Sequence, residues 1–523
     1  MKLKKLYYIL SFVLVLCISC TDDFDEMNQD PNTLTEEQID ATMAGPAFAN
    51  VLYKGIHQGS NTGVYDDQGT YGLITMLQSM TFVHYLSTTS STFATERNGI
   101  NDGWVNRGWL RFYTQALPSL NIAYESAEGN AEAIAVLDIW KVFIFHQMTD
   151  EWGPVPYSEA GNGKSSVAYD SQQKMYDDFF NLLASAEKTL SSTSESTVGI
   201  FASYDRIYDG DIAKWRKFGN SLRLRLALRI SDVDPAKAKV EAEAAINAGV
   251  MQSNGDAAFF KVSQYTDNNF VKIAPAWGFV MTSSMESLLK GYNDPRMEIW
   301  FAPSLKETYT GQPNGRGVTR AWNDSTLSFV NNATFGDQLF ATKPIEVMLT
   351  SETYFNLAEA ALNGWNVTNT AQNYYEQGIS LSLEQWQVKD QTTIDNYITG
   401  SSVPVKPDLV DAYAQNGLDT NPPVKVAVSW AASEQDQRTQ IAVQKYLALF
   451  PESWETWADL RRTDANILYP LLNTDNPDVG RGLMKRLTYL DSETTSNAEE
   501  VKAAINLLGG PDNGATRVWW DVK

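Results

Sequence analysis

Hydrophobic side chains recur every three or four positions over long stretches of the chain, which is the spacing of one helix face. Met175, Phe179, Leu182 and Leu183 are an example within one such stretch. On this basis we predict helices over residues 108–128, 131–149, 171–190, 212–230, 235–248, 345–363, 370–387, 454–462 and 498–508. Pro118 lacks a backbone N–H and can kink the first of them. The pattern predicts a mostly α-helical protein.

The stretch 212–230 has a second possible interpretation. Leucines alternate from Leu222 to Leu228, as they would in a strand. The length of the stretch and its richness in Leu, Arg, Lys and Ala favour a helix instead. In a helix Trp215, Phe218 and Leu222 share one face, so we expect them to be buried.

Two irregular stretches separate the helical ones. Residues 251–340 are rich in Gly, Asn, Thr and aromatic residues and predict short strands, whereas the proline-containing stretch 390–435 predicts a loop. The paired helices could form a degenerate helical-hairpin solenoid, although the tetratricopeptide consensus letters are absent. We predict a single domain over 36–523, with a helical scaffold at about 108–250 and 341–390, insertions at about 60–107 and 251–340, and a C-terminal region over 391–523.

The N-terminus has the features of an export signal. Three lysines among the first five residues precede a fourteen-residue apolar run over 6–19, too short to span a bilayer. The run ends at Cys20 and resembles a bacterial lipobox, although Cys17 occupies the usual leucine position. We predict a signal peptide over 1–19, a lipidated Cys20 and an acidic tether over 20–35; an ordinary secretory peptide is the alternative.

Composition narrows the possible chemistry. The net charge of −22 is unfavourable for nucleic-acid binding, because phosphate contacts need clustered cations. The two cysteines lie close to the N-terminus and only three histidines are present, so neither a disulfide framework nor a Cys- or His-based metal site is expected. We expect no cofactor; a bound calcium ion is possible, but no spacing in the sequence specifies one.

Motifs for catalysis are incomplete. Gly163-Lys164-Ser165 resembles the end of a phosphate-binding loop, but Ser158 stands where that loop needs its first glycine. The neighbouring carboxylates Asp150 and Glu151 could serve a glycosidase, yet adjacent acidic residues are common in a chain with 63 of them. His146 lies within a predicted helix and is expected to be a core residue. We therefore predict that the protein is not an enzyme.

Several segments, in order along the chain, resemble the SusD/RagB family of outer-membrane nutrient-binding lipoproteins. The segment 215–229 (WRKFGNSLRLRLALR) resembles the signature helix of that family. The other similar segments are 150–157 (DEWGPVPY), 294–296 (DPR), 352–361 (ETYFNLAEAA), 444–450 (QKYLALF), 454–462 (WETWADLRR) and 517–521 (RVWWD).

This resemblance implies a fold with four tetratricopeptide-like helix pairs as scaffold and irregular insertions that carry the ligand site. It also implies a non-catalytic lid over a SusC-like TonB-dependent transporter, lipid-anchored in the outer membrane and facing the cell exterior. The acidic residues after Cys20 are similar to the surface-export signal of lipoproteins in the Bacteroidota. The implied ligand is a glycan or oligosaccharide.

A sugar has an apolar face and a polar rim, so its site needs exposed flat aromatic side chains close to amides or carboxylates. Such residues occur over 85–109 and 265–322. The candidates for ligand binding are Tyr85, Asn101, Trp104, Tyr265, Trp277 and Trp322. Ordinary packing is the alternative for each aromatic residue.

Three functions stay open at this point: capture of a glycan, capture of a peptide by the same fold, and a surface glycoside hydrolase. Residues 215, 218 and 222 of the signature helix, and the Trp454–Trp457 pair, are predicted to stabilise the fold rather than to bind ligand. Arg223, Arg225 and Arg229 are predicted to pair with acidic residues.

Overall fold

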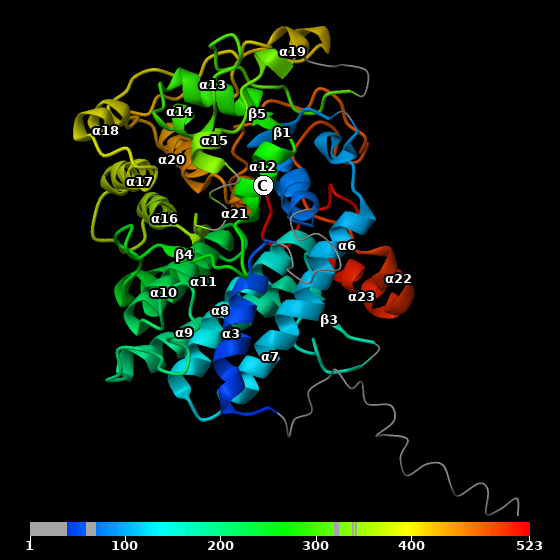
Figure 1. Cartoon of the computed structure of the whole chain (residues 1–523), viewed down its shortest axis with the longest axis vertical. Helices are drawn as coiled ribbons and strands as arrows, with labels where there is room; N and C mark the ends of the chain where they lie inside the picture. The colour runs from blue at the N-terminus through cyan, green and yellow to red at the C-terminus, as the bar shows by residue number, and fades with distance from the viewer. Residues whose placement is uncertain are drawn as a thin grey trace, which may run out of the picture.

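The computed structural model of the chain describes residues 39–58, 70–90, 92–164, 166–317, 324–336, 339 and 342–523. Helices dominate the fold, and the strands form small sheets (Figure 1). The helices of the first half are η2 (Ala41–Met43), α3 (Ala44–Lys54), η3 (Gly72–Ser79), α5 (Met80–Phe82), η4 (Ala94–Arg97), α6 (Asp102–Arg111), η5 (Phe112–Ala116), α7 (Leu117–Ser126), α8 (Ala131–Trp152), α9 (Gln172–Ser192), α10 (Ile212–Arg229) and α11 (Pro235–Ala248).

The second half of the chain has shorter helices between longer loops. They are α12 (Asn269–Ala276), α13 (Ser283–Gly291), α14 (Arg296–Trp300), η6 (Asp324–Thr326), α15 (Asn332–Phe335), α16 (Thr350–Leu362), α17 (Ala371–Gln385), α18 (Gln391–Ile398), α19 (Asp411–Gln415), α20 (Glu434–Leu449), α21 (Ser453–Thr463), α22 (Asp491–Ser496) and α23 (Ala498–Leu508). The strands pair antiparallel in twos: β1 (Leu86–Thr88) with β5 (Phe279–Met281), β2 (Val155–Pro156) with β3 (Tyr169–Asp170), and β4 (Ala258–Phe260) with β6 (Ile345–Met348).

The long helices confirm the sequence pattern. Four of them begin at a side chain that accepts a hydrogen bond from a backbone N–H of the first turn: Asn130 for α8, Ser171 for α9, Asp211 for α10 and Thr370 for α17. Such caps satisfy N–H groups that have no partner within the helix. The stretch with alternating leucines is α10, so the helical interpretation is confirmed.

Three predictions of secondary structure need correction. The helix predicted over 345–363 begins as strand β6, because Ile345 and Val347 are β-branched and the strand pairs with β4. The predicted loop over 390–435 contains α18 and α19, and the stretch 251–340 holds α12 to α15 besides the expected short strands. Around Pro118 the chain stays helical, but the π-helical segment η5 precedes α7, where the proline lies in the first turn.

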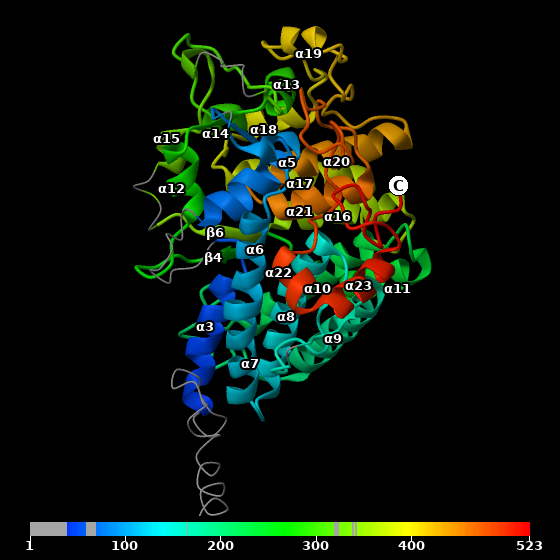
Figure 2. The ribbon, with the colours of Figure 1, turned by 90° about the vertical axis from the view of Figure 1, so that its right-hand side faces the viewer.

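Helices that are neighbours in sequence lie against each other. Contacts join α8 to α9, α10 to α11, and α16 to α17. Figure 2 shows α3, α7, α8 and α9 together in the lower part of the molecule, while α13, α18 and α19 lie at the opposite end. The expected fold class, mostly helical, is confirmed; a tetratricopeptide-like arrangement of the pairs stays a prediction.

Most side chains of helix α10 are buried. Trp215, Phe218 and Leu222 have no exposed surface, as predicted. On the same helix, Arg225 donates two hydrogen bonds to Glu352 of α16 at 2.7 and 2.5 Å. Arg229 contacts Glu455 of α21 at 2.6 Å. The signature arginines therefore connect three helices that are far apart in the sequence.

We expect the substitution Arg225→Met to lower the free energy of unfolding by about 3–5 kcal/mol, because it leaves the buried Glu352 without its cation. Denaturant unfolding measures this loss. Lys239→Met is the control: Lys239 is half-exposed and lies 3.8 Å from Glu243, so its loss costs about 1 kcal/mol or less. A loss no larger than that of the control would contradict a structural role for the pair.

Candidate functional site

The π-helix η3 contacts two helices that bear on the predicted ligand site: α6, which carries Trp104, and α12, which Trp277 follows. Helices α6 and α12 both contact η3, although their sequences lie more than 150 residues apart. Figure 1 shows α12 beside the helices of the blue segment, with α6 on their other side. The two predicted regions, 85–109 and 265–322, are thus brought together by the fold.

Trp277 lies directly over the backbone of η3. It follows the last residue of α12 and is partly exposed. A Cβ atom at Gly72 would come within 2.4 Å of two carbons of the Trp277 ring, so the indole occupies the space that any other side chain would need. Glycine at position 72 therefore allows a flat aromatic ring to rest against the helix.

Trp104 lies on α6, which approaches the same end of η3. Its ring is partly exposed and makes an edge contact with Phe93, with the ring centres 5.9 Å apart. One turn later the Arg107 guanidinium reaches the hydroxyl of Thr70, 3.5 Å away and two residues before the start of η3. Asn101 is exposed and caps α6, its Oδ1 accepting a hydrogen bond from the Trp104 N–H at 3.2 Å.

Two of the other candidates, Tyr85 and Tyr265, do not join this group. Tyr85 has no exposed surface; its hydroxyl contacts the Tyr446 carbonyl and lies 2.8 Å from the Thr456 hydroxyl. The prediction that Tyr85 binds ligand therefore conflicts with its position in the core, since the ring faces α20 and α21. Tyr265 is 71% exposed, but it precedes α12 whereas Trp277 follows it, so the eight-residue helix keeps the two apart. Trp322, like Cys20, lies outside the described residues.

The short helix η4 holds the loops beside this group, a role that the sequence did not reveal. The buried Glu96 accepts hydrogen bonds from the Thr88 N–H at 2.6 Å and the Ser87 hydroxyl at 3.2 Å. Arg97 forms an ion pair with Asp475 at 2.7 Å, and the Asn98 amide donates to the carbonyls of Gly480 and Gly482. Asn98 has a positive φ of 61°, which asparagine tolerates better than most residues. An asparagine in the sequence does not by itself reveal that its φ is positive.

Buried carboxylates elsewhere are occupied by structural contacts. Asp150 accepts hydrogen bonds from the Tyr176 hydroxyl at 2.6 Å and the Trp520 indole at 2.7 Å. Glu151 lies 2.7 Å from the His57 imidazole. His146 is buried, which lowers its pKa to about 3, so this imidazole is neutral and is a core residue as predicted. Among the described residues, no group of three or more His, Cys, Asp or Glu is placed to hold a metal ion.

We compared the chain with known protein families. A family model described as "Susd and RagB outer membrane lipoprotein" matches residues 26–521. The chain belongs to the SusD-like family. The predicted resemblance is therefore confirmed, and with it the prediction of a non-catalytic binding protein.

Solved structures agree with this assignment. A chitin-binding SusD homologue from Flavobacterium johnsoniae is 31% identical and has a TM-score of 0.82, covering 92% of this chain and 99% of the homologue. A SusD homologue from Bacteroides uniformis is 31% identical with a TM-score of 0.81 and the same coverage. One from Bacteroides vulgatus is 27% identical with a TM-score of 0.82, covering 91% of this chain and 97% of its own.

Two further findings concern curated relatives of this SusD-like chain and the length of its helices. No curated protein is similar enough to match it. In the described part of the chain, none of the helices has both the length and the apolar character that crossing a membrane requires.

Glu96 predicts a pH dependence of stability. Burial raises the pKa of Glu96 to about 7. The hydrogen bonds from Thr88 and Ser87 and the charge of Arg316 oppose this rise. The folded state therefore holds a proton that the unfolded state releases near pH 4.5, and stability is lost as the pH rises toward 7 and above. Glu96→Gln mimics the protonated acid and should become more stable than wild type by up to about 3 kcal/mol above pH 7. Denaturant unfolding at pH values from about 4.5 to 8 measures this; a difference that does not change with pH would contradict it.

Proposed function

We propose that this SusD-like protein captures a glycan or oligosaccharide at the cell surface and delivers it to a SusC-like TonB-dependent transporter in the outer membrane. The ligand face is the aromatic group at the start of η3, formed by Trp277 and Trp104 with Asn101 and Arg107. The observation that carries the proposal is the Trp277 ring resting on Gly72, because a supported, partly exposed indole offers the flat apolar surface that a sugar ring needs.

Chitin-type sugars are the first ligands to test. The homologue from Flavobacterium johnsoniae is described as chitin-binding and shares 31% of its residues with this chain. The aromatic group also has polar side chains beside it: the exposed Asn101 amide and the Arg107 guanidinium of α6. Such groups supply the hydrogen bonds that orient a sugar on an aromatic ring.

The binding test uses affinity electrophoresis against a panel of polysaccharides that includes soluble chitin derivatives, followed by titration with the retarding sugar. Trp277→Ala should raise the dissociation constant about tenfold or more, because central aromatic contacts carry most of the binding energy of a site. Gly72→Ala should also weaken binding, since its methyl group displaces the Trp277 ring.

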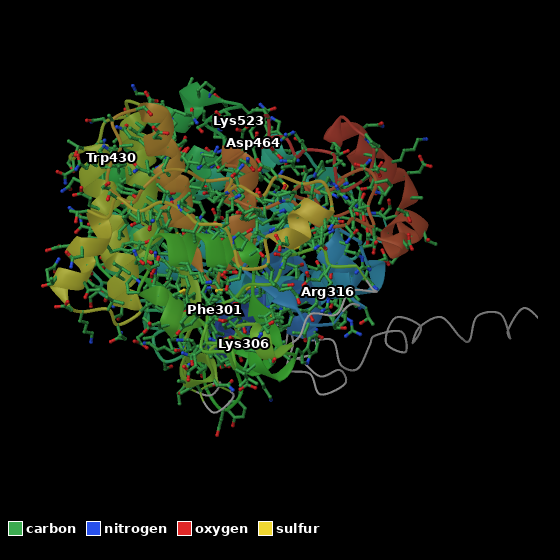
Figure 3. All side chains as sticks on the ribbon, turned by 90° about the horizontal axis from the view of Figure 1, so that it is seen from above. Phe301, Lys306, Arg316, Trp430, Asp464 and Lys523 are labelled. Atoms are coloured by element: carbon green, nitrogen blue, oxygen red, sulfur yellow. The ribbon has the colours of Figure 1, made fainter. Side chains whose placement is uncertain are left out.

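Trp430→Ala is the matched control for these two variants. Trp430 is also partly exposed, but it lies beside Tyr375 of α17, with the ring centres 5.0 Å apart (Figure 3). The Trp430→Ala protein should bind the sugar with the same affinity as wild type.

The proposed site would be overturned if Trp277→Ala and Gly72→Ala both bind with wild-type affinity while circular dichroism shows an intact fold. Shortening of the polysaccharide would overturn the assignment as a binding protein.

Anchoring through Cys20 is tested by membrane fractionation. Cys20→Ala should move the protein from the membrane fraction to the soluble fraction, because acyl chains on this thiol supply the membrane affinity. Cys17→Ala is the control and should stay in the membrane fraction. A Cys20→Ala protein that stays with the membrane and still co-purifies with the transporter would show that the transporter alone holds it there.

A further inference from the structure

A cavity lies at the C-terminal end of α21. Its volume is about 700 Å³, and it is bounded by the end of α21, the segment 464–470 that follows it, the segment 478–485, and residues near position 515. None of the residues that line it belongs to the aromatic group at η3, so the cavity is a separate site.

Cationic side chains gather on one wall of this cavity. They are Arg481, Lys485 and Arg517. Arg481 is exposed and makes no ion pair with any described residue. Lys485 and Arg517 share a single buried carboxylate, Asp521, which contacts Arg517 and lies 3.9 Å from the Lys485 ammonium. Asp521 is therefore the ion-pair partner of both Lys485 and Arg517, whereas Arg481 has no ion-pair partner among the described residues.

A fourth cation lies beneath the wall. Arg461 has no exposed surface and donates hydrogen bonds to the carbonyls of Lys485 and Asp150, each at 2.7 Å. Within the described residues it forms no ion pair. Burial lowers the pKa of Arg461 to about 10, with Asp150 and Asp521 acting against the shift, and it also lowers the pKa of Lys485, with Asp521 acting against it. Arg481 and Lys485 are cationic groups of the wall that an anionic ligand can reach.

The remaining lining limits what the cavity can hold. Asp464 and Asp478 lie on its rim, and Phe82, Leu460 and Leu468 supply apolar surface. His84 is buried, which lowers its pKa to about 3, so it adds no charge. The two rim carboxylates repel a multiply charged anion but accept hydrogen bonds from hydroxyl groups. The volume lies within the range of small-molecule sites.

We propose that this cavity is a second binding site, for a sugar unit that carries a single carboxylate, such as a uronic acid. The carboxylate faces Arg481 and Lys485, the hydroxyl groups donate to Asp464 and Asp478, and the apolar face of the ring lies against Phe82 and Leu460. The site recognises the charge of the sugar, in contrast to the aromatic group at η3, which recognises its flat face.

The test compares two disaccharides that differ only in the carboxylate: cellobiouronic acid and cellobiose. Isothermal titration at low ionic strength is carried out on the Trp277→Ala protein, in which binding at η3 is weakened. Cellobiouronic acid should bind and cellobiose should not. Arg481→Ala and Lys485→Gln, each added to Trp277→Ala, should weaken binding about fivefold or more, and added salt should weaken it as well.

Lys239→Ala is the charge-matched control, because Lys239 is a half-exposed lysine on α11. It should bind cellobiouronic acid unchanged. Equal binding of both disaccharides, no binding of either, or affinity that is insensitive to Arg481→Ala and Lys485→Gln in folded protein would overturn the proposal. Binding of a zwitterionic dipeptide in place of the acidic sugar would also overturn it. Arg481 and Lys485 do not belong to the aromatic group at η3, so the effect of substituting them distinguishes this cavity from residual binding at η3.

Discussion

Arg225 and Arg229 of α10 place two positive charges in the interior, and carboxylates from two other helices pair with them. Glu352 comes from α16 and Glu455 from α21, more than 100 and 200 residues away along the chain. A buried cation without its carboxylate costs several kcal/mol, so these helices must dock against α10 in one arrangement. The signature segments of the family are therefore segments that hold the scaffold together.

The ligand face depends on this scaffold without belonging to it. Helix η3 contacts α21, which carries Glu455, and presents Gly72 to the Trp277 ring on its other side. Helix α6 comes from the N-terminal part of the chain and α12 from the middle, so the aromatic group exists only when both are docked on η3. The loops beside it are held through η4, by the Arg97–Asp475 ion pair and the Asn98 amide. Ligand-binding residues on short elements are thus positioned by long buried helices.

The two binding sites that we propose use different chemistry and are lined by different residues. At η3 the ligand face is aromatic with neutral and cationic polar groups around it. At the C-terminal side the cavity is lined by charges of both signs. The overall negative charge of the chain does not reveal this arrangement, because net charge says nothing about how charges are distributed on the surface.

The sequence by itself determined the helical scaffold, the burial of Trp215 and Phe218, the pairing of the signature arginines with acids, and the family. These features depend on local periodicity and on residues that are costly to bury alone, and both can be read along the chain. It did not distinguish the exposed from the buried aromatic residues: Tyr85 and Trp277 were both candidates for ligand binding, yet one lies in the core and the other on Gly72. It also missed Glu96 and the cation cluster around Arg481. Only the tertiary structure decided these, because exposure and charge crowding arise where segments far apart in the chain come into contact.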